Sequence, residues 1–211
     1  MQQPNTQSTS ELILRETASQ TAGPYVHIGL APALAGLPPR DEEIWSEMAG
    51  PDAEGEPIEV VGTVTDGNGD LVRDALIEAW QADANGVYQK EFDLRKPFNS
   101  FGRTATTFDG GSEWTLRTIK PGAVPHASGE SMAPHINLSI FARGINLHLQ
   151  TRLYFEDEQA ANDRCPVLSR IESPARRQTL IAARESGEEG RVRYRFDIRL
   201  QGDGETVFFD F

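Results

Sequence analysis

The sequence is poor in cysteine and has no long apolar run. Its one cysteine, Cys165, has no partner within the chain for a disulfide or for a Cys-x-x-Cys metal clip. Nowhere do roughly 18 apolar residues follow one another, as a membrane-spanning helix requires, and the polar first ten residues lack the basic and apolar regions of a secretion signal. These absences predict a soluble, cytoplasmic protein.

Basic residues are also in the minority. The 211 residues include 20 Lys and Arg against 32 Asp and Glu, which gives a formal net charge of -12. Nucleic acids and anionic membranes are bound through basic surfaces, so the sequence argues against both as partners. A small anionic substrate would need a fixed positive charge at its binding site.

The middle of the chain contains no Ser/Gly-rich or Pro-rich linker, which predicts one main domain. We expect residues 1–55 to form an N-terminal tail, an arm and a short helix over residues 41–49, where Ile44, Trp45 and Met48 have helical spacing. From residue 56 the apolar pattern changes to period two. Residues 56–211 are therefore predicted to form a β-rich domain.

Short runs of β-branched and aromatic residues, separated by turn signals, predict an all-β sandwich or barrel with a few short helices. The expected strands are 58–65, 75–81, 102–107, 113–118, 136–142, 145–154, 193–200 and 206–211. Ser173 and Pro174 have the positions of an N-cap and a first helical residue, which predicts a helix over residues 175–184.

The most informative segment is the strand that begins near His135. Successive side chains of a strand point to opposite faces, so Ile136 and Leu138 are predicted to face the core while His135, Asn137 and Arg143 share the other face. A His-x-His pair on that face would offer two imidazole ligands to a metal. This chain has His-x-Asn instead.

Fixed spacings over residues 62–88 identify a family. The pattern Gly62-x-Val64-x-Asp66-Gly67-x-Gly69-x-Leu71-Val72-x-Asp74-Ala75-x-Ile77-Glu78-x-Trp80-Gln81-Ala82-Asp83-x-x-Gly86-x-Tyr88 resembles the intradiol ring-cleavage dioxygenases. Three later stretches fit the same family, Thr118-Ile119-Lys120-Pro121-Gly122, Ala133-Pro134-His135-Ile136 and Arg164-Cys165-Pro166-Val167-Leu168. The resemblance covers residues 12–211 and implies an eight-stranded β-sandwich. It also implies an Fe(III) ion held by two tyrosinates and two histidines.

Only two of the four iron-ligand positions carry a ligand in this chain. By resemblance, Tyr88 and His135 match one tyrosine and one histidine, whereas Val124 and Asn137 occupy the other two positions. Two protein ligands with a single negative charge cannot retain Fe(III). The resemblance therefore implies that the iron is held by a homologous beta subunit and not by this chain.

The resemblance further implies that this chain lines a substrate cavity shared with its partner, through Thr21, Gly23, Pro24, Tyr25 and Arg143. A guanidinium at position 143 would bind a benzoate carboxylate bidentately. The implied function is an iron-free alpha subunit of a heteromeric dioxygenase of the beta-ketoadipate pathway of aromatic catabolism. Such an enzyme cleaves protocatechuate with O2 to 3-carboxy-cis,cis-muconate, and its alpha-beta pairs assemble into a larger oligomer, with residues 1–55 packing on the partner.

Two other functions stay open at this point, a non-enzymatic β-sandwich binding or scaffolding module and a self-sufficient dioxygenase with substitute ligands. Each residue also has a structural interpretation. Tyr88 and His135 could be packed side chains with hydrogen-bonded polar atoms. Arg143 could be a solvated charge at a strand end, and residues 21–25 could be a turn without further role.

Overall fold

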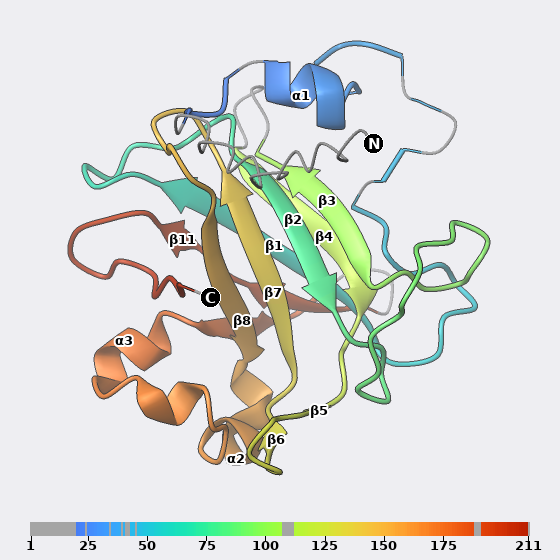
Figure 1. The fold of residues 1–211 in the computed structure, drawn as a ribbon, viewed down its shortest axis with the longest axis vertical. Coiled ribbons are helices and arrows are strands. Elements are labelled where there is room, and N and C mark those ends of the chain that lie inside the picture. Colours follow the sequence, from blue (N-terminus) through green and yellow to red (C-terminus); the bar gives the residue numbers. More distant parts are fainter. Residues whose placement is uncertain are drawn as a thin grey trace, which may run out of the picture.

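The computed structural model describes residues 20–23, 25–33, 35–38, 40, 43–44, 46–106, 112–187 and 191–210. Strands dominate the fold, and the helices are few and short (Figure 1). The all-β class predicted from the sequence is confirmed.

The strands form two layers of a sandwich. In one layer β1 pairs antiparallel with β4 and parallel with β10 and β11, and β9 continues beyond β10. The bounds of these strands are Pro57–Thr65 for β1, Glu113–Ile119 for β4, Ile181–Glu185 for β9, Val192–Arg195 for β10 and Ile198–Arg199 for β11.

The other layer has the order β8-β7-β2-β3, with every neighbouring pair antiparallel. Its strands are β2 (Leu76–Gln81), β3 (Phe101–Ala105), β7 (His135–Phe141) and β8 (Leu149–Phe155). The two layers are joined where β8 pairs in parallel with β9, at Tyr154 with Ile181 and at Phe155 with Ala182.

The main core lies between the layers. β1 contributes Ile58 and Val60, and β4 contributes Trp114, which is completely buried. From the facing layer, β7 contributes Ile136 and Leu138, as the alternation in the sequence predicted. Burial of these apolar side chains is the main force that holds the two layers together.

β10 and β11 are two parts of one interrupted strand, because both pair with β1 in continuous register. Between them, the Phe196 amide donates to the Val61 carbonyl at 2.8 Å, and Asp197 accepts a hydrogen bond from the Thr63 amide at 2.9 Å. Gly62 permits this close approach, since a Cβ there would lie 1.9 Å from the Phe196 carbonyl oxygen. With β10 and β11 counted as one strand, the described part of the sandwich has eight strands, the number that the resemblance implied, although β9 was not among the strands expected from the sequence.

Two helix predictions were wrong over part of their length. Of residues 41–49, numbers 41, 42 and 45 lie outside the described residues, and the others are not helical. Met48 instead bonds through its amide to Arg117 and through its carbonyl to Asn99, both at 2.8 Å. Ser173 does cap a helix, but α3 (Pro174–Gln178) is short and the chain continues into β9, because Ala182 is buried in the core and β9 pairs with β10.

Two strand predictions also need correction. The strand expected at 145–154 begins only at Leu149, after a turn. The segment 206–210 forms no strand and makes one bridge, from Phe209 to Gln150, while Phe211 lies outside the described residues.

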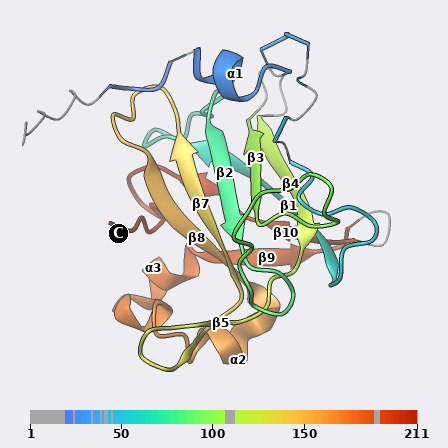
Figure 2. The same cartoon turned by 45° about the vertical axis from the view of Figure 1, so that its right-hand side comes forward.

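The short elements gather at the two ends of the sandwich (Figures 1 and 2). α1 (Tyr25–Leu30) covers the end at which β2 begins and β7 ends. At the opposite end lie β5 (Val124–Pro125), β6 (Ser131–Met132), η1 (Glu156–Glu158), α2 (Gln159–Asn162) and η2 (Leu168–Arg170).

Two glycines pack the turn after β2 against the segment that leads to β5. Gly86 has a φ of 78°, and a Cβ on it would lie 2.0 Å from the Ala123 carbonyl oxygen. A Cβ on Gly122 would lie 2.5 Å from the Ala84 carbonyl oxygen, and the Gly122 amide donates to Asp83 at 2.8 Å. These contacts fix the positions of Tyr88 and Val124 relative to each other.

We expect Gly86→Ala to destabilise the protein more than Gly129→Ala. Both residues have left-handed backbones, which cost an alanine about 1–2 kcal/mol. Only Gly86 would in addition force its new methyl group into a carbonyl oxygen, because nothing lies within 4 Å of the corresponding position at Gly129. Urea unfolding should show an extra loss of about 2 kcal/mol for Gly86→Ala. Equal losses would show that this turn is not closely packed.

Candidate functional site

The residues predicted for the site lie at opposite ends of β7. His135 is the first residue of β7 and Asn137 follows shortly, whereas Arg143 comes two residues after the strand's end at Phe141. A strand rises about 3.3 Å per residue, so His135 and Phe141 are roughly 20 Å apart. The site residues therefore form two separate clusters.

The first cluster holds the four positions that the resemblance equates with iron ligands, and we call it the ligand-position cluster: Tyr88, Val124, His135 and Asn137. The Asn137 side-chain amide donates to the Tyr88 hydroxyl at 3.1 Å and to the Trp80 carbonyl at 3.1 Å. The Tyr88 ring stacks on Trp80 with ring centroids 5.8 Å apart. Val124 is buried on β5, whose partner β6 runs directly into the start of β7.

The donor atoms of this cluster do not fit a ferric ion. Val124 has no ligand atom, and the Asn137 amide is already used to bind Tyr88 and Trp80. Burial raises the pKa of Tyr88, although the Asn137 hydrogen bond and the charge of Arg152 lower it, so the phenol stays protonated at neutral pH. Within the described ranges, no three His, Cys, Asp or Glu side chains are placed to hold a metal ion.

His135 is a neutral, buried imidazole. It is 1% exposed, its Nδ1 lies 2.8 Å from the Ala133 carbonyl oxygen, and its ring packs on Tyr154 at 5.6 Å. Burial lowers its pKa to about 4, with a further lowering by the charge of Arg152 and an opposing effect of the Ala133 carbonyl. The His135 side chain is thus a buried, packed residue between β7 and β8.

The second cluster lies at the other end of β7, where the N-terminal arm crosses it. The Gly144 amide donates to the Thr21 hydroxyl at 2.8 Å, so the arm is attached at the end of β7 next to Arg143. Gly23 precedes α1, and Tyr25 in α1 is 82% exposed. Pro24 lies outside the described residues.

Sequence reasoning missed two residues that surround Arg143. Its Nε donates to the carboxylate of Asp74, which is buried, while the arginine side chain is 60% exposed. His27 of α1 is buried beside this pair, and its pKa is lowered by burial and by Arg143 but raised by Asp74. Asp74 was part of the quoted family pattern, yet its pairing depends on a contact across 69 residues of sequence, which no local signal reveals. We call Thr21, His27, Asp74 and Arg143 the arm-end cluster.

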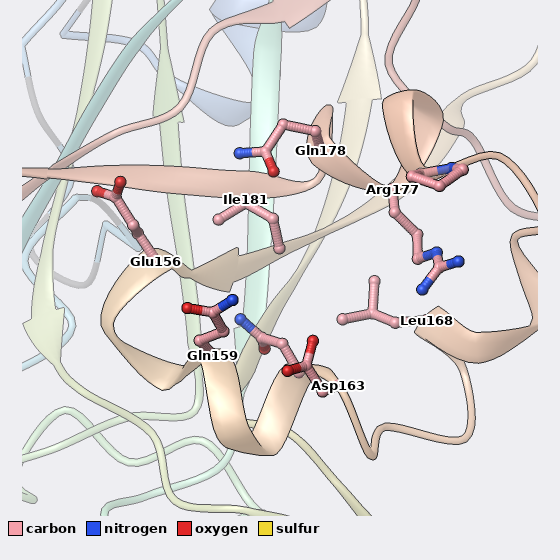
Figure 3. Close-up of a pocket in the computed structure, with 9 residues that line it drawn as sticks. Glu156, Gln159, Asp163, Leu168, Arg177, Gln178 and Ile181 are labelled. Carbon is pink, nitrogen blue, oxygen red and sulfur yellow. The ribbon is translucent and has the colours of Figure 1, made fainter.

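A separate pocket of about 320 Å³ opens between α2, α3 and β9 (Figure 3). Gln159 and Asp163 border it from the side of α2, Arg177 from α3 and Ile181 from β9. None of the site residues predicted from the sequence lines this pocket.

None of the helices in the described parts of the chain is long and apolar enough to cross a bilayer.

Comparison with known proteins identifies the family. A family model described as "Dioxygenase" matches residues 31–202. The chain is 66% identical to the protocatechuate 3,4-dioxygenase alpha chain of Pseudomonas putida, over 94% of this chain and 98% of that one. It is 35% identical to the protocatechuate 3,4-dioxygenase beta chain of Burkholderia cepacia, over 72% of this chain and 67% of the relative.

Among solved structures, hydroxyquinol 1,2-dioxygenase from Pseudomonas putida DLL-E4 shares the fold, with a TM-score of 0.58 and 22% identity over 75% of this chain and 60% of that one. The family match and the identity to both kinds of subunit agree with the motif spacings. The chain therefore belongs to the intradiol ring-cleavage dioxygenase family.

Proposed function

We propose that the chain is an iron-free alpha subunit of a dioxygenase that cleaves protocatechuate. It forms part of the wall of the substrate cavity and contributes a positive charge there. The Fe(III) is held by a homologous beta subunit. The intradiol cleavage by O2 to 3-carboxy-cis,cis-muconate, a step of aromatic catabolism, takes place at that iron. The similarity to named alpha and beta chains supports a two-chain enzyme.

The observation that carries this proposal is the separation of the two clusters along β7. A carboxylate held by Arg143 is roughly 20 Å from the ligand-position cluster, much farther than one aromatic ring spans. Within a single copy of the chain, one substrate molecule cannot contact both Arg143 and the ligand-position cluster. Arg143 must serve a reactive centre that another chain supplies.

The arm-end cluster has the features needed to hold the carboxylate of protocatechuate. Asp74 binds Nε of Arg143, and the arginine side chain is 60% exposed. We propose that its terminal nitrogens form a bidentate pair with a carboxylate. In a chain with a net charge of -12, such a fixed cation provides the local attraction that an anionic substrate needs.

Exposed apolar side chains at the same end support a covering partner. Tyr25 of α1 is 82% exposed, and Leu147, in the loop that follows Gly144, is 68% exposed. Exposed apolar patches mark interaction surfaces. We propose that the beta subunit covers this end, and that alpha-beta pairs assemble into a larger oligomer in the cytoplasm.

The chain produced alone should be colourless, contain no stoichiometric iron and show no turnover of protocatechuate, because its ligand-position cluster lacks two donors. Co-production with an iron-bearing beta chain should yield a red-brown, active complex. Absorption spectra, metal analysis and oxygen uptake check this. A lone chain that is coloured and active would contradict the proposal.

In the complete enzyme, Arg143→Gln should lower kcat/KM for protocatechuate more than tenfold, because truncating one partner of a desolvated ion pair costs about 2–5 kcal/mol. The value for catechol, which has no carboxylate, should hardly change, and the iron content should stay the same. Arg95→Gln is the matched control, since the Arg95 side chain is 90% exposed and pairs with the nearby Asp93. An unchanged preference for protocatechuate over catechol would remove Arg143 from the site.

His135 should make the isolated chain sensitive to acid. Its pKa is 6.5 in the unfolded chain and about 4 in the folded one. Its contribution to the free energy of unfolding is therefore fully present above pH 6.5 and is lost as the pH falls to 4. The loss amounts to about 3 kcal/mol at 1.36 kcal/mol per pKa unit. Urea unfolding at several pH values should show that the free energy of unfolding changes less with pH in His135→Gln than in the unmodified chain. An identical pH dependence would mean that His135 takes up its proton in the folded state.

A further inference from the structure

We propose that the guanidinium of Arg152 is a built-in substitute for the missing metal ion, and that it keeps metal cations out of the ligand-position cluster. The loss of two ligand side chains would then be only part of the reason that this chain carries no iron. The inference concerns this chain alone and can fail or succeed whatever the role of a beta subunit.

Arg152 lies on β8 directly opposite Asn137 of β7, and two residues further along β8 Tyr154 lies opposite His135. Residues opposite each other in an antiparallel pair point to the same face, with Cβ atoms about 4.5–5.5 Å apart. The arginine side chain therefore leaves the sheet on the face that carries both His135 and Asn137.

Contacts with two other segments hold the guanidinium there. Arg152 Nη1 donates to the Met132 sulfur at 3.4 Å, and Met132 is the β6 residue that pairs with Val124. The guanidinium carbon lies 5.9 Å from the centroid of the Phe209 ring, in a cation-π contact. Arg152 is thus fixed between the strand that carries Asn137 and the segment that carries Val124.

This placement puts a positive charge beside the ligand-position cluster. Arg152 lies opposite Asn137, whose side chain binds the Tyr88 hydroxyl. Its Nη1 contacts Met132, the residue that pairs with Val124. A single cation at this place provides the local positive charge that an ion would otherwise provide.

A guanidinium cannot lose its charge at any pH at which the protein is folded. A ferric ion at the same place would be repelled by it in a partly buried environment, where charges are poorly screened. Restoring the two lost ligands should therefore be insufficient to create an iron site while Arg152 remains.

The test is a set of variants of the full chain, each loaded anaerobically with Fe(II), oxidised in air and desalted. Val124→Tyr with Asn137→His restores the ligand set but keeps Arg152. Adding Arg152→Gln removes the charge. We expect the triple variant to retain at least about tenfold more iron than the double variant, together with a tyrosinate-to-iron absorption band that the double variant lacks.

Two further variants make the outcome specific, both in the double-variant background. Arg152→Lys keeps the positive charge and should leave iron retention low. Arg195→Gln removes an arginine of β10, in the layer that does not contain Arg152. Arg195 pairs with Glu113 and Asp197, and its loss should also leave iron retention low. Thermal unfolding verifies that each variant is folded, and Arg152→Met replaces Arg152→Gln if the latter is not.

Equal iron retention by the double and triple variants, whether high or low, would overturn the proposal. So would a comparable increase with Arg195→Gln, because the effect would then reflect net charge and not the position of Arg152.

Discussion

The length and rigidity of β7 are the constraint on which the site depends. This strand is hydrogen bonded to β2 on one side and to β8 on the other along nearly its whole length, so its ends cannot approach each other. One end carries His135 and Asn137, and the other leads to Arg143. This separation supports the proposal that Arg143 serves a reactive centre on another chain.

The ligand-position cluster is closely packed, although two of its four positions, Val124 and Asn137, differ from the ligands that the resemblance implies. Gly86 and Gly122 still bring the Tyr88 turn and the Val124 segment together, and Asn137 now binds the Tyr88 hydroxyl. The same contacts close this end of the sandwich. The cluster itself holds a neutral phenol and a neutral imidazole, with the guanidinium of Arg152 nearby.

The sequence predicted best where a pattern is local and repeated. The alternation of β7 and the turn signals around β1 were sufficient to place those strands and their core faces. The family spacings singled out Tyr88, Val124, His135 and Asn137, whose correspondence to iron ligands stays a prediction. The prediction failed where contacts between residues far apart in the sequence determine the local structure. Ala182 has the local appearance of a helical residue, but it is buried in the core in β9, and Met48 follows an extended path because Arg117 and Asn99 bind its backbone. Asp74, His27 and Arg152 were missed because their roles arise only from contacts across strands.

The measurement that tests the account most directly is anomalous X-ray diffraction at the iron absorption edge, on crystals of the alpha-beta complex with protocatechuate bound without oxygen. The account predicts an iron peak in the beta chain only, with the substrate carboxylate against Arg143 of the alpha chain. An iron peak between Tyr88 and His135, or a substrate carboxylate far from Arg143, would contradict it.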